Sequence, residues 1–211
     1  MKPLTTTESP SAQRRDSREA IVNAAERLFL KHGFGGVSMD ELAAEAGVAR
    51  RTLYNQFANK EEIFREMLLR VSMQLGNVLP PGIETRGDVE DVLHLIARAV
   101  LAFQAPPEYI GLVRMTIADT RQFPWIATAF DSVLKPYLDR FARYLSYLTS
   151  LSVLDCPNPF LAARQFLGLL NEPILWPRVL GQDSESPAPD TVVEEAVRMF
   201  LLRYRPTHPR K

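Results

Sequence analysis

Residues 33–63 constrain the fold of this chain more than any other stretch, because their glycines and capping residues mark where helices begin and end. Ser38 is followed three residues later by Glu41, a capping box in which each side chain satisfies a free backbone N–H group. Gly47 then allows a sharp turn, and a second capping pair starts at Asn59. The pattern therefore predicts a helix, a tight turn, a short second helix and a third helix.

The short second helix of this unit is predicted over the run ARRTLYNQF. Leu53 and Phe57, four residues apart, share one face and can hold the helix against a core. Its other faces carry polar side chains that can donate to phosphates or base edges. This is the helix-turn-helix layout that places one helix in the major groove of DNA. The predicted DNA-binding residues are Ser38, Arg50, Arg51, Thr52, Tyr54, Asn55 and Lys60. Base edges are expected for Arg50, Arg51, Thr52 and Asn55, and phosphates for Thr52, Tyr54 and Lys60.

The stretch from about Arg18 to Phe64 resembles the DNA-binding domain of the TetR family of transcriptional regulators. The resemblance rests on the runs AAERLFLKHGF, SMDELAAEAGVA and TLYNQFANKEEIF. Ala49 stands where the family usually has Ser or Thr, so the recognition helix is expected to lack a side-chain N-cap. The resemblance implies a homodimeric repressor that binds a DNA operator and is released by a small-molecule effector.

The overall charge of the chain gives it no general attraction for nucleic acid. Its 211 residues include 25 basic and 25 acidic side chains, so the formal net charge is zero. A DNA-binding face must therefore come from the local placement of basic residues. The single cysteine, Cys156, excludes an internal disulfide and fits a reducing compartment. No apolar run approaches the roughly 18 residues of a membrane helix, and we expect a cytoplasmic protein without a membrane partner.

Helix breakers divide the chain into three segments. Residues 1–13 are rich in Thr, Ser and Pro and are expected to form a flexible arm, residues 14–76 the DNA-binding domain, and residues 77–211 a helical effector-binding and dimerisation domain. No alternating strand pattern persists, so we predict an all-α protein of about nine helices. Beyond the helix-turn-helix pair, helices are predicted at about 15–32, 60–75, 88–105, 107–121, 124–151, 159–180 and 190–204, with the sixth perturbed by Pro173 and Pro177.

The last two predicted helices carry wide apolar stripes. Such stripes are explained either by ordinary core packing or by one side facing a partner. The family resemblance implies that this pair meets its copy in a four-helix dimer interface. The residues assigned to that interface are Phe160, Leu167, Leu170, Val193, Val197 and Phe200.

The middle helices are rich in large apolar residues. Each one alone is explained by core packing, whereas the family resemblance implies a ligand cavity among them. Few charged groups lie in these helices, which favours a hydrophobic or aromatic effector. The predicted effector-binding residues are Phe103, Met115, Trp125, Phe130, Phe166 and Trp176.

Enzymatic chemistry is not indicated by the sequence. His32, His94 and His208 are far apart, and no nucleophile, phosphate-binding or metal-ligand motif is present, so we expect no enzyme, no metal and no cofactor. Arg114 and Asp119 could form a pair in the second domain. The alternative function is a DNA-binding regulator without a small ligand, controlled by a partner or constitutive. A filled second domain would favour that alternative, and an open cavity would favour the effector.

Overall fold

A computed structural model describes residues 10–76, 78–79, 82–83, 87–182 and 186–206. These residues form helices joined by short turns, and no strand occurs among them. The helices are α1 (Pro10–His32), α2 (Met39–Glu45), α3 (Arg50–Gln56), α4 (Lys60–Gly76), α5 (Val89–Gln104), α6 (Pro107–Asp119), α7 (Trp125–Ser150), α8 (Pro159–Leu170), the π-helix η2 (Asn171–Leu175), α9 (Trp176–Leu180) and α10 (Pro189–Tyr204). If α8, η2 and α9 are counted as one continuous run, the described part has nine helices. The predicted all-α fold is confirmed.

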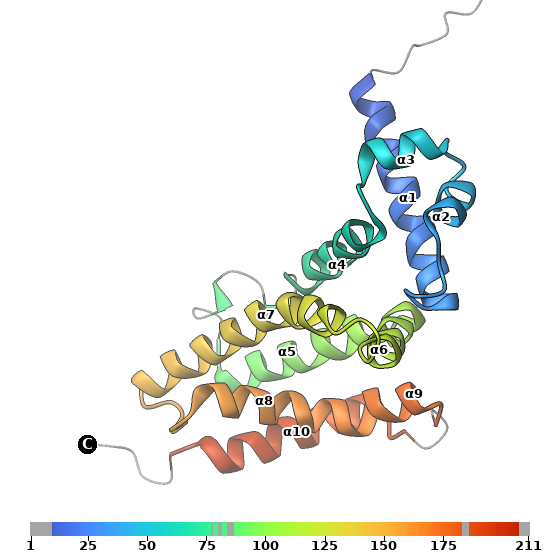
Figure 1. Cartoon of the computed structure of the whole chain (residues 1–211). Coiled ribbons are helices and arrows are strands. Elements are labelled where there is room, and N and C mark those ends of the chain that lie inside the picture. The colour runs from blue at the N-terminus through green and yellow to red at the C-terminus, as the bar shows by residue number, and fades with distance from the viewer. Residues whose placement is uncertain (1–9, 77, 80–81, 84–86, 183–185, 207–211) are drawn as a thin grey trace, which may run out of the picture.

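The first three helices form a small head at one end of the molecule (Figure 1). Leu42 of α2 and Leu53 of α3 are fully buried against α1, and Phe57 closes the same core. The capping box is present as predicted: the Glu41 backbone N–H donates to Ser38 Oγ (3.2 Å), and the Ser38 backbone N–H donates to the Glu41 carboxylate (2.7 Å). These two bonds fix where α2 begins.

Two other predicted helix starts behave differently. Ala49 gives α3 no side-chain cap, as expected from its residue type. At the start of α4 the Glu62 N–H donates to Asn59 Oδ1 (3.0 Å), but the Glu62 carboxylate accepts from the Ala58 N–H (2.8 Å). The bond from the Glu62 N–H to the Asn59 side chain is therefore present as predicted. The return bond to the Glu62 carboxylate comes from Ala58, one residue before the expected Asn59.

The larger domain is a helical bundle below the head (Figure 1). In it α8 packs on α7 and on α10, while α10 also packs on α5. Phe166 of α8 is fully buried between two aromatic rings, with centroids 5.5 Å from Phe141 and 5.1 Å from Phe200. The α4 helix runs from the head to the bundle and packs against α7.

A π-helical turn interrupts the run from α8 to α9 at residues Asn171–Leu175. Pro173 lies within it and Pro177 in the turn that follows. Neither residue can donate the backbone bond that a regular α-helix needs there, and a widened turn relieves that mismatch. The predicted perturbation of this helix is thus confirmed, and its form is a π turn.

The predicted boundaries of the later helices agree with the structure within two residues. The first helix is the exception, because α1 begins at Pro10, inside the segment predicted as a flexible arm. Residues 1–9, the rest of that arm, lie outside the described part. The predicted domain boundary falls at residue 77, which also lies outside it, so the division into 14–76 and 77–211 stays a prediction.

Candidate DNA-binding surface and effector cavity

The recognition helix α3 is held in place from below by the core and from the side by α1. Leu53 and Phe57 bury its inner face. The Arg18 guanidinium donates to the Gln56 carbonyl at the end of α3 (3.1 Å) and lies 4.2 Å from the centre of the Phe57 ring. The Gln56 side chain in turn donates to the Arg14 carbonyl (2.9 Å). These contacts set the direction of α3. Arg18 and Gln56 carry no local sequence signal for this role, because their partners are 38 or more residues away.

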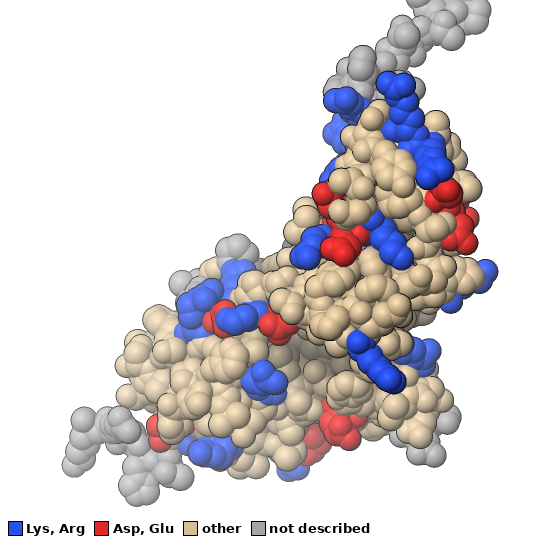
Figure 2. Space-filling model, in the orientation of Figure 1, with Lys and Arg blue, Asp and Glu red and all other residues tan. Residues whose placement is uncertain are grey.

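The outer side of α3 is open to solvent. Arg51, Tyr54 and Asn55 are exposed and Thr52 is half-buried. Arg50 is also exposed and pairs with Asp40 of α2 (2.9 Å). An exposed pair of this kind contributes little to stability, so Arg50 can exchange its carboxylate partner for DNA at small cost. Figure 2 shows Lys and Arg side chains gathered on the head around α3 and the start of α1.

Lys60 makes two hydrogen bonds within the protein. Its ammonium group donates to the carbonyls of Phe34 (2.8 Å) and Val37 (2.9 Å) and lies 4.5 Å from the centre of the Phe34 ring. Burial lowers the pKa of Lys60, although the nearby carboxylates of Asp119 and Glu41 oppose this effect. The ammonium group has three N–H donors, so one stays available. Its role as a phosphate contact remains a prediction, and its bonds give it a second role in holding the loop before α2.

The head is joined to the bundle through Phe34. The Phe34 backbone N–H donates to the Asp119 carboxylate at the end of α6 (2.7 Å). Its ring lies 5.1 Å from the Phe123 and Trp125 rings, centre to centre, in edge-to-face arrangements. Phe64 of α4 completes the group, 5.4 Å from Trp125. Trp125 therefore belongs to the domain junction, which corrects its assignment as an effector contact.

The predicted pair of Arg114 with Asp119 is wrong. Arg114 donates instead to the carbonyls of Arg178 (2.6 Å) and Val179 (2.8 Å), at the end of α9. Arg178 donates to the carbonyls of Gln104 (2.9 Å) and Ala105 at the end of α5. Both guanidinium groups thus cap helix ends with unsatisfied carbonyls, and together they connect α5, α6 and α9.

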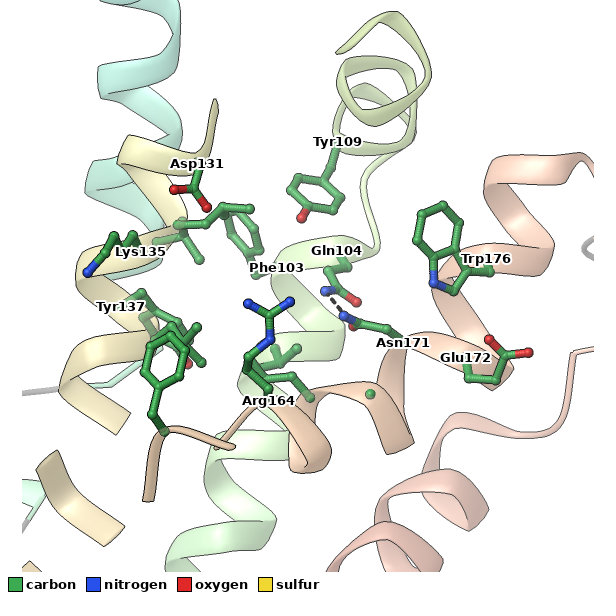
Figure 3. A pocket seen from close by; sticks show the side chains of 17 residues that line it. Phe103, Gln104, Tyr109, Asp131, Lys135, Tyr137, Arg164, Asn171, Glu172 and Trp176 are labelled. Carbon is green, nitrogen blue, oxygen red and sulfur yellow. Dashed lines mark hydrogen bonds between the residues drawn. The ribbon is translucent and has the colours of Figure 1, made fainter. Parts of the chain in front are cut away.

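A cavity of about 560 Å³ lies in the larger domain, among α5, α6, α7, α8 and η2 (Figure 3). Two of the predicted effector residues, Phe103 and Trp176, line it, and their contact with an effector stays a prediction. Phe160 and Leu167, which were predicted for the dimer interface, line it as well. Most of the remaining wall is aliphatic or aromatic. Its volume is within the range of small-molecule sites.

Polar groups enter this cavity from several helices. Gln104 Nε2 donates to Asn171 Oδ1 (3.0 Å), and the Tyr109 and Tyr137 side chains also line the wall. Burial raises the pKa of Tyr109 to about 12 and also raises the pKa of Tyr137, so both phenols are neutral at physiological pH. The charged lining residues are two acids and two bases: Asp131, Glu172, Lys135 and Arg164. The wall therefore carries no net charge.

The other predicted effector residues do not line this cavity. Met115 and Phe166 are buried in the core, and Phe130 is partly buried and packs against it. Their large apolar side chains gave the same sequence signal as lining residues, because interior packing and ligand walls select the same residue types.

Four of the six predicted dimer residues lie inside their own protomer. Leu170, Val193, Val197 and Phe200 are at most 2% exposed in the single chain. Side chains covered in this way have no surface to offer a second copy, which corrects these four assignments. Phe160 and Leu167 keep exposed surface, so their place in the interface stays a prediction. The outward face of α10 carries Met199 and Leu202 instead.

The architecture defines a two-domain regulator with a helix-turn-helix head and a helical domain that contains a cavity. Residues 21–67 match the family model for bacterial regulatory proteins of the tetR family. Residues 91–206, more than half of the chain, match the model for the C-terminal domain of AefR-like transcriptional repressors. The chain belongs to the TetR family of transcriptional regulators.

Similar chains include named repressors. The transcriptional repressor BepR of Brucella suis is 31% identical over 91 residues, 43% of either chain. The repressor ComR of Escherichia coli is 40% identical over 53 residues, 25% of either chain. The alignments thus span less than half the length of these curated relatives.

Solved structures are similar over nearly the whole chain. The flavonoid-responsive regulator FrrA has a TM-score of 0.76 and 28% identity, over 91% of this chain and 98% of its own. A TetR family regulator from Pseudomonas syringae has a TM-score of 0.71 and 29% identity, over 89% of this chain and 96% of its own. In the described part of the present chain, no helix is both long and apolar enough to span a membrane.

Replacing Lys60 by Ala is predicted to weaken binding to all DNA sequences about equally. Loss of one phosphate contact should reduce the slope of log affinity against log salt by roughly one unit. Titration of labelled operator and scrambled DNA at several salt concentrations measures both effects. Lys31→Ala, which replaces an exposed lysine in the last turn of α1, is the control and should keep the parent slope. An unchanged slope in Lys60→Ala would show that this ammonium group only holds the loop.

At least one of Arg50 and Arg51 is predicted to contact a guanine edge. A bidentate contact of this kind is worth roughly 1–3 kcal/mol of discrimination. Replacement by Ala should therefore relax the sequence preference at one position of each half-site, as measured with a panel of single-base operator variants. Arg143→Ala, an exposed arginine of α7, is the control. A uniform loss across the panel for both head variants would mean that these arginines contact only the backbone.

Proposed function

We propose that the chain is a homodimeric repressor that binds a double-stranded DNA operator through α3 and is released by a small hydrophobic or aromatic effector. One observation carries the effector part of this proposal. Tyr109, at the start of α6, lines the cavity, while Asp119, at the end of α6, bonds to Phe34 of the head. A single helix thus contacts both the proposed effector and the DNA-binding head.

The DNA-binding part rests on the head. Its recognition helix presents exposed polar side chains and is fixed to α1 and the core. A two-fold dimer places two such helices in successive major grooves, roughly 34 Å apart. Affinity then depends on the distance between the heads, so a change of that distance is sufficient to release the DNA.

The effector proposed for the cavity is hydrophobic or aromatic. Aromatic and aliphatic side chains form most of the wall, and its charges balance. FrrA, which is similar over 91% of this chain, is named as flavonoid-responsive, and this supports an aromatic effector here. The alternative of a regulator without a small ligand expects a filled second domain, whereas the described residues surround about 560 Å³ of open space.

A pair of aromatic rings connects the cavity to the head. Phe103 and Tyr109 lie 4.8 Å apart, centre to centre, and line both the main cavity and a second one of about 250 Å³. The second cavity is also lined by Leu30 of α1 and Met67 of α4. An effector that displaces these rings pushes toward the helices that carry the head. The heads then have two arrangements, one that fits the operator and one that does not. The effector lowers DNA affinity to the extent that it binds the second arrangement more tightly than the first.

The dimer is proposed to form through the outward faces of α8 and α10. Leu161, Met199 and Leu202 are 48%, 52% and 78% exposed, respectively. These residues replace the buried set predicted from the apolar stripes.

Two glutamate substitutions on α10 are predicted to separate dimer assembly from folding. Leu202→Glu should give a folded monomer with much weaker operator binding, because the charge lies in the proposed interface. Val197→Glu should lower the free energy of unfolding by at least about 3 kcal/mol, since Val197 is 1% exposed and the charge is buried without a partner. Circular dichroism melts and sedimentation measure the two outcomes. A native-mass dimer of Leu202→Glu would place the interface elsewhere.

Hydroxyflavone is predicted to bind the protein and lower its operator affinity over the same concentration range. Reciprocity requires that operator DNA weaken hydroxyflavone binding by the same factor. Quenching of Trp176 emission, read in a Trp125→Phe background, measures the binding, because Trp176 lines the cavity and Trp125 does not. Asp119→Ala should keep the quenching and reduce the coupling to DNA, since it removes the bond to the head. Binding without any effect on DNA would contradict the proposed release.

A further inference from the structure

We infer that the cavity selects an uncharged aromatic molecule that carries both a hydroxyl and a separate oxygen acceptor, with Gln104 and Tyr137 as the groups that recognise them. This inference rests on the proposed effector function and specifies its chemistry. It comes from buried polar atoms of the wall that have no partner of their own.

Gln104 supplies an acceptor. The residue ends α5 and is only 6% exposed. Its Nε2 is used by Asn171, whereas its Oε1 has no hydrogen-bond partner among the described residues. A buried carbonyl oxygen left in this state is costly, and a ligand hydroxyl would satisfy it. A hydroxyl both donates and accepts, so it suits this amide pair in either orientation of the two side-chain amides.

Asn171, the second member of this pair, lies on the cavity-facing stripe of α8 where the π turn begins. Asn171 is the first residue of η2, and it faces the cavity together with Phe160, Arg164 and Leu167. These four residues recur at spacings of four, three and four along one stripe of the helix. Single π turns are frequent at functional sites, and this one begins at the residue whose amide lies against Gln104 in the middle of the wall (Figure 3).

Tyr137 supplies a donor from the opposite side. Its hydroxyl is buried and has no hydrogen-bond partner within the described part of the chain. Burial raises its pKa, so it stays a neutral O–H group that needs an acceptor. Figure 3 shows Tyr137 on α7 and Gln104 on α5, on different walls. The ligand therefore needs oxygens at two separate edges, and a carbonyl or ether oxygen suits the tyrosine.

The charged residues of the wall favour a neutral ligand. Arg164 extends toward the cavity in Figure 3, and no acidic partner is found for it among the described residues. Lys135 pairs with Asp139 (2.8 Å), while the exposed acids Asp131 and Glu172 also line the wall. A ligand anion would gain from the arginine and lose against these two carboxylates. An oxygen acceptor of a neutral ligand can use the arginine without that loss.

The test is isothermal titration of the full-length protein with flavone, monohydroxyflavones and a flavone carboxylate. Flavone has the ring carbonyl and no hydroxyl, so at least one hydroxyflavone should bind about tenfold tighter in the parent protein. Gln104→Met, which removes the acceptor at similar size, should abolish that advantage without weakening flavone itself. Gln182→Met, which replaces an exposed glutamine beyond α9, is the matched control and should keep the tighter binding of hydroxyflavone.

Tyr137→Phe provides a second measurement that keeps the ring and removes only the hydroxyl. It should weaken flavone and hydroxyflavone alike, by about fivefold, with an unchanged melting temperature. Equal affinities for flavone and all hydroxyflavones in the parent protein would overturn this inference and leave the effector proposal intact. Tightest binding of the carboxylate, lost in Arg164→Gln, would also overturn it in favour of an acid site. Failure of the whole series to bind would overturn both the inference and the proposed effector class.

Discussion

The contacts of Phe34 are the constraint on which the arrangement of the two domains depends. Its N–H group donates to Asp119 of the bundle, its carbonyl accepts from Lys60, and its ring packs among Phe64 and Trp125. Gly33 precedes it with a φ of 74°, and a Cβ there would lie 3.1 Å from the Asp119 carboxylate. A glycine is therefore needed both for the turn and for the close approach of α6. One residue thus ties the DNA-binding head to the helix that borders the cavity.

The helix α8 shows how one element serves three surfaces. Ala162, Ala163 and Phe166 face the core, while Phe160 and Arg164 face the cavity. The remaining side carries Leu161 and is open to solvent, where we propose that a second copy binds. Because a helix has 3.6 residues per turn, shifts of one residue move a side chain from one surface to the next. An apolar residue type alone therefore does not say which surface it belongs to.

The head was predictable from the sequence because its signals are local. The Ser38–Glu41 capping box involves residues three apart, and the Leu53–Phe57 pair involves residues four apart. The same locality explains why Ala49 could be expected to leave α3 without a side-chain cap. After the head, helix boundaries set by proline were predicted to within two residues for the same reason. By itself, the sequence determined the all-α fold, the helix-turn-helix unit and the exposed polar side of α3.

Only the tertiary structure decided which apolar residues form the core, the cavity wall or the outer face. Val197 and Leu202 both lie on α10, yet one is buried and the other is 78% exposed, because α5 and α8 cover one side of that helix. Arg114 found carbonyl partners 64 and 65 residues away instead of the nearby Asp119. The unpaired side-chain oxygen of Gln104 likewise became visible only when α5 and η2 were brought together. Local spacing fixes the faces of a helix, whereas long-range packing decides what each face meets.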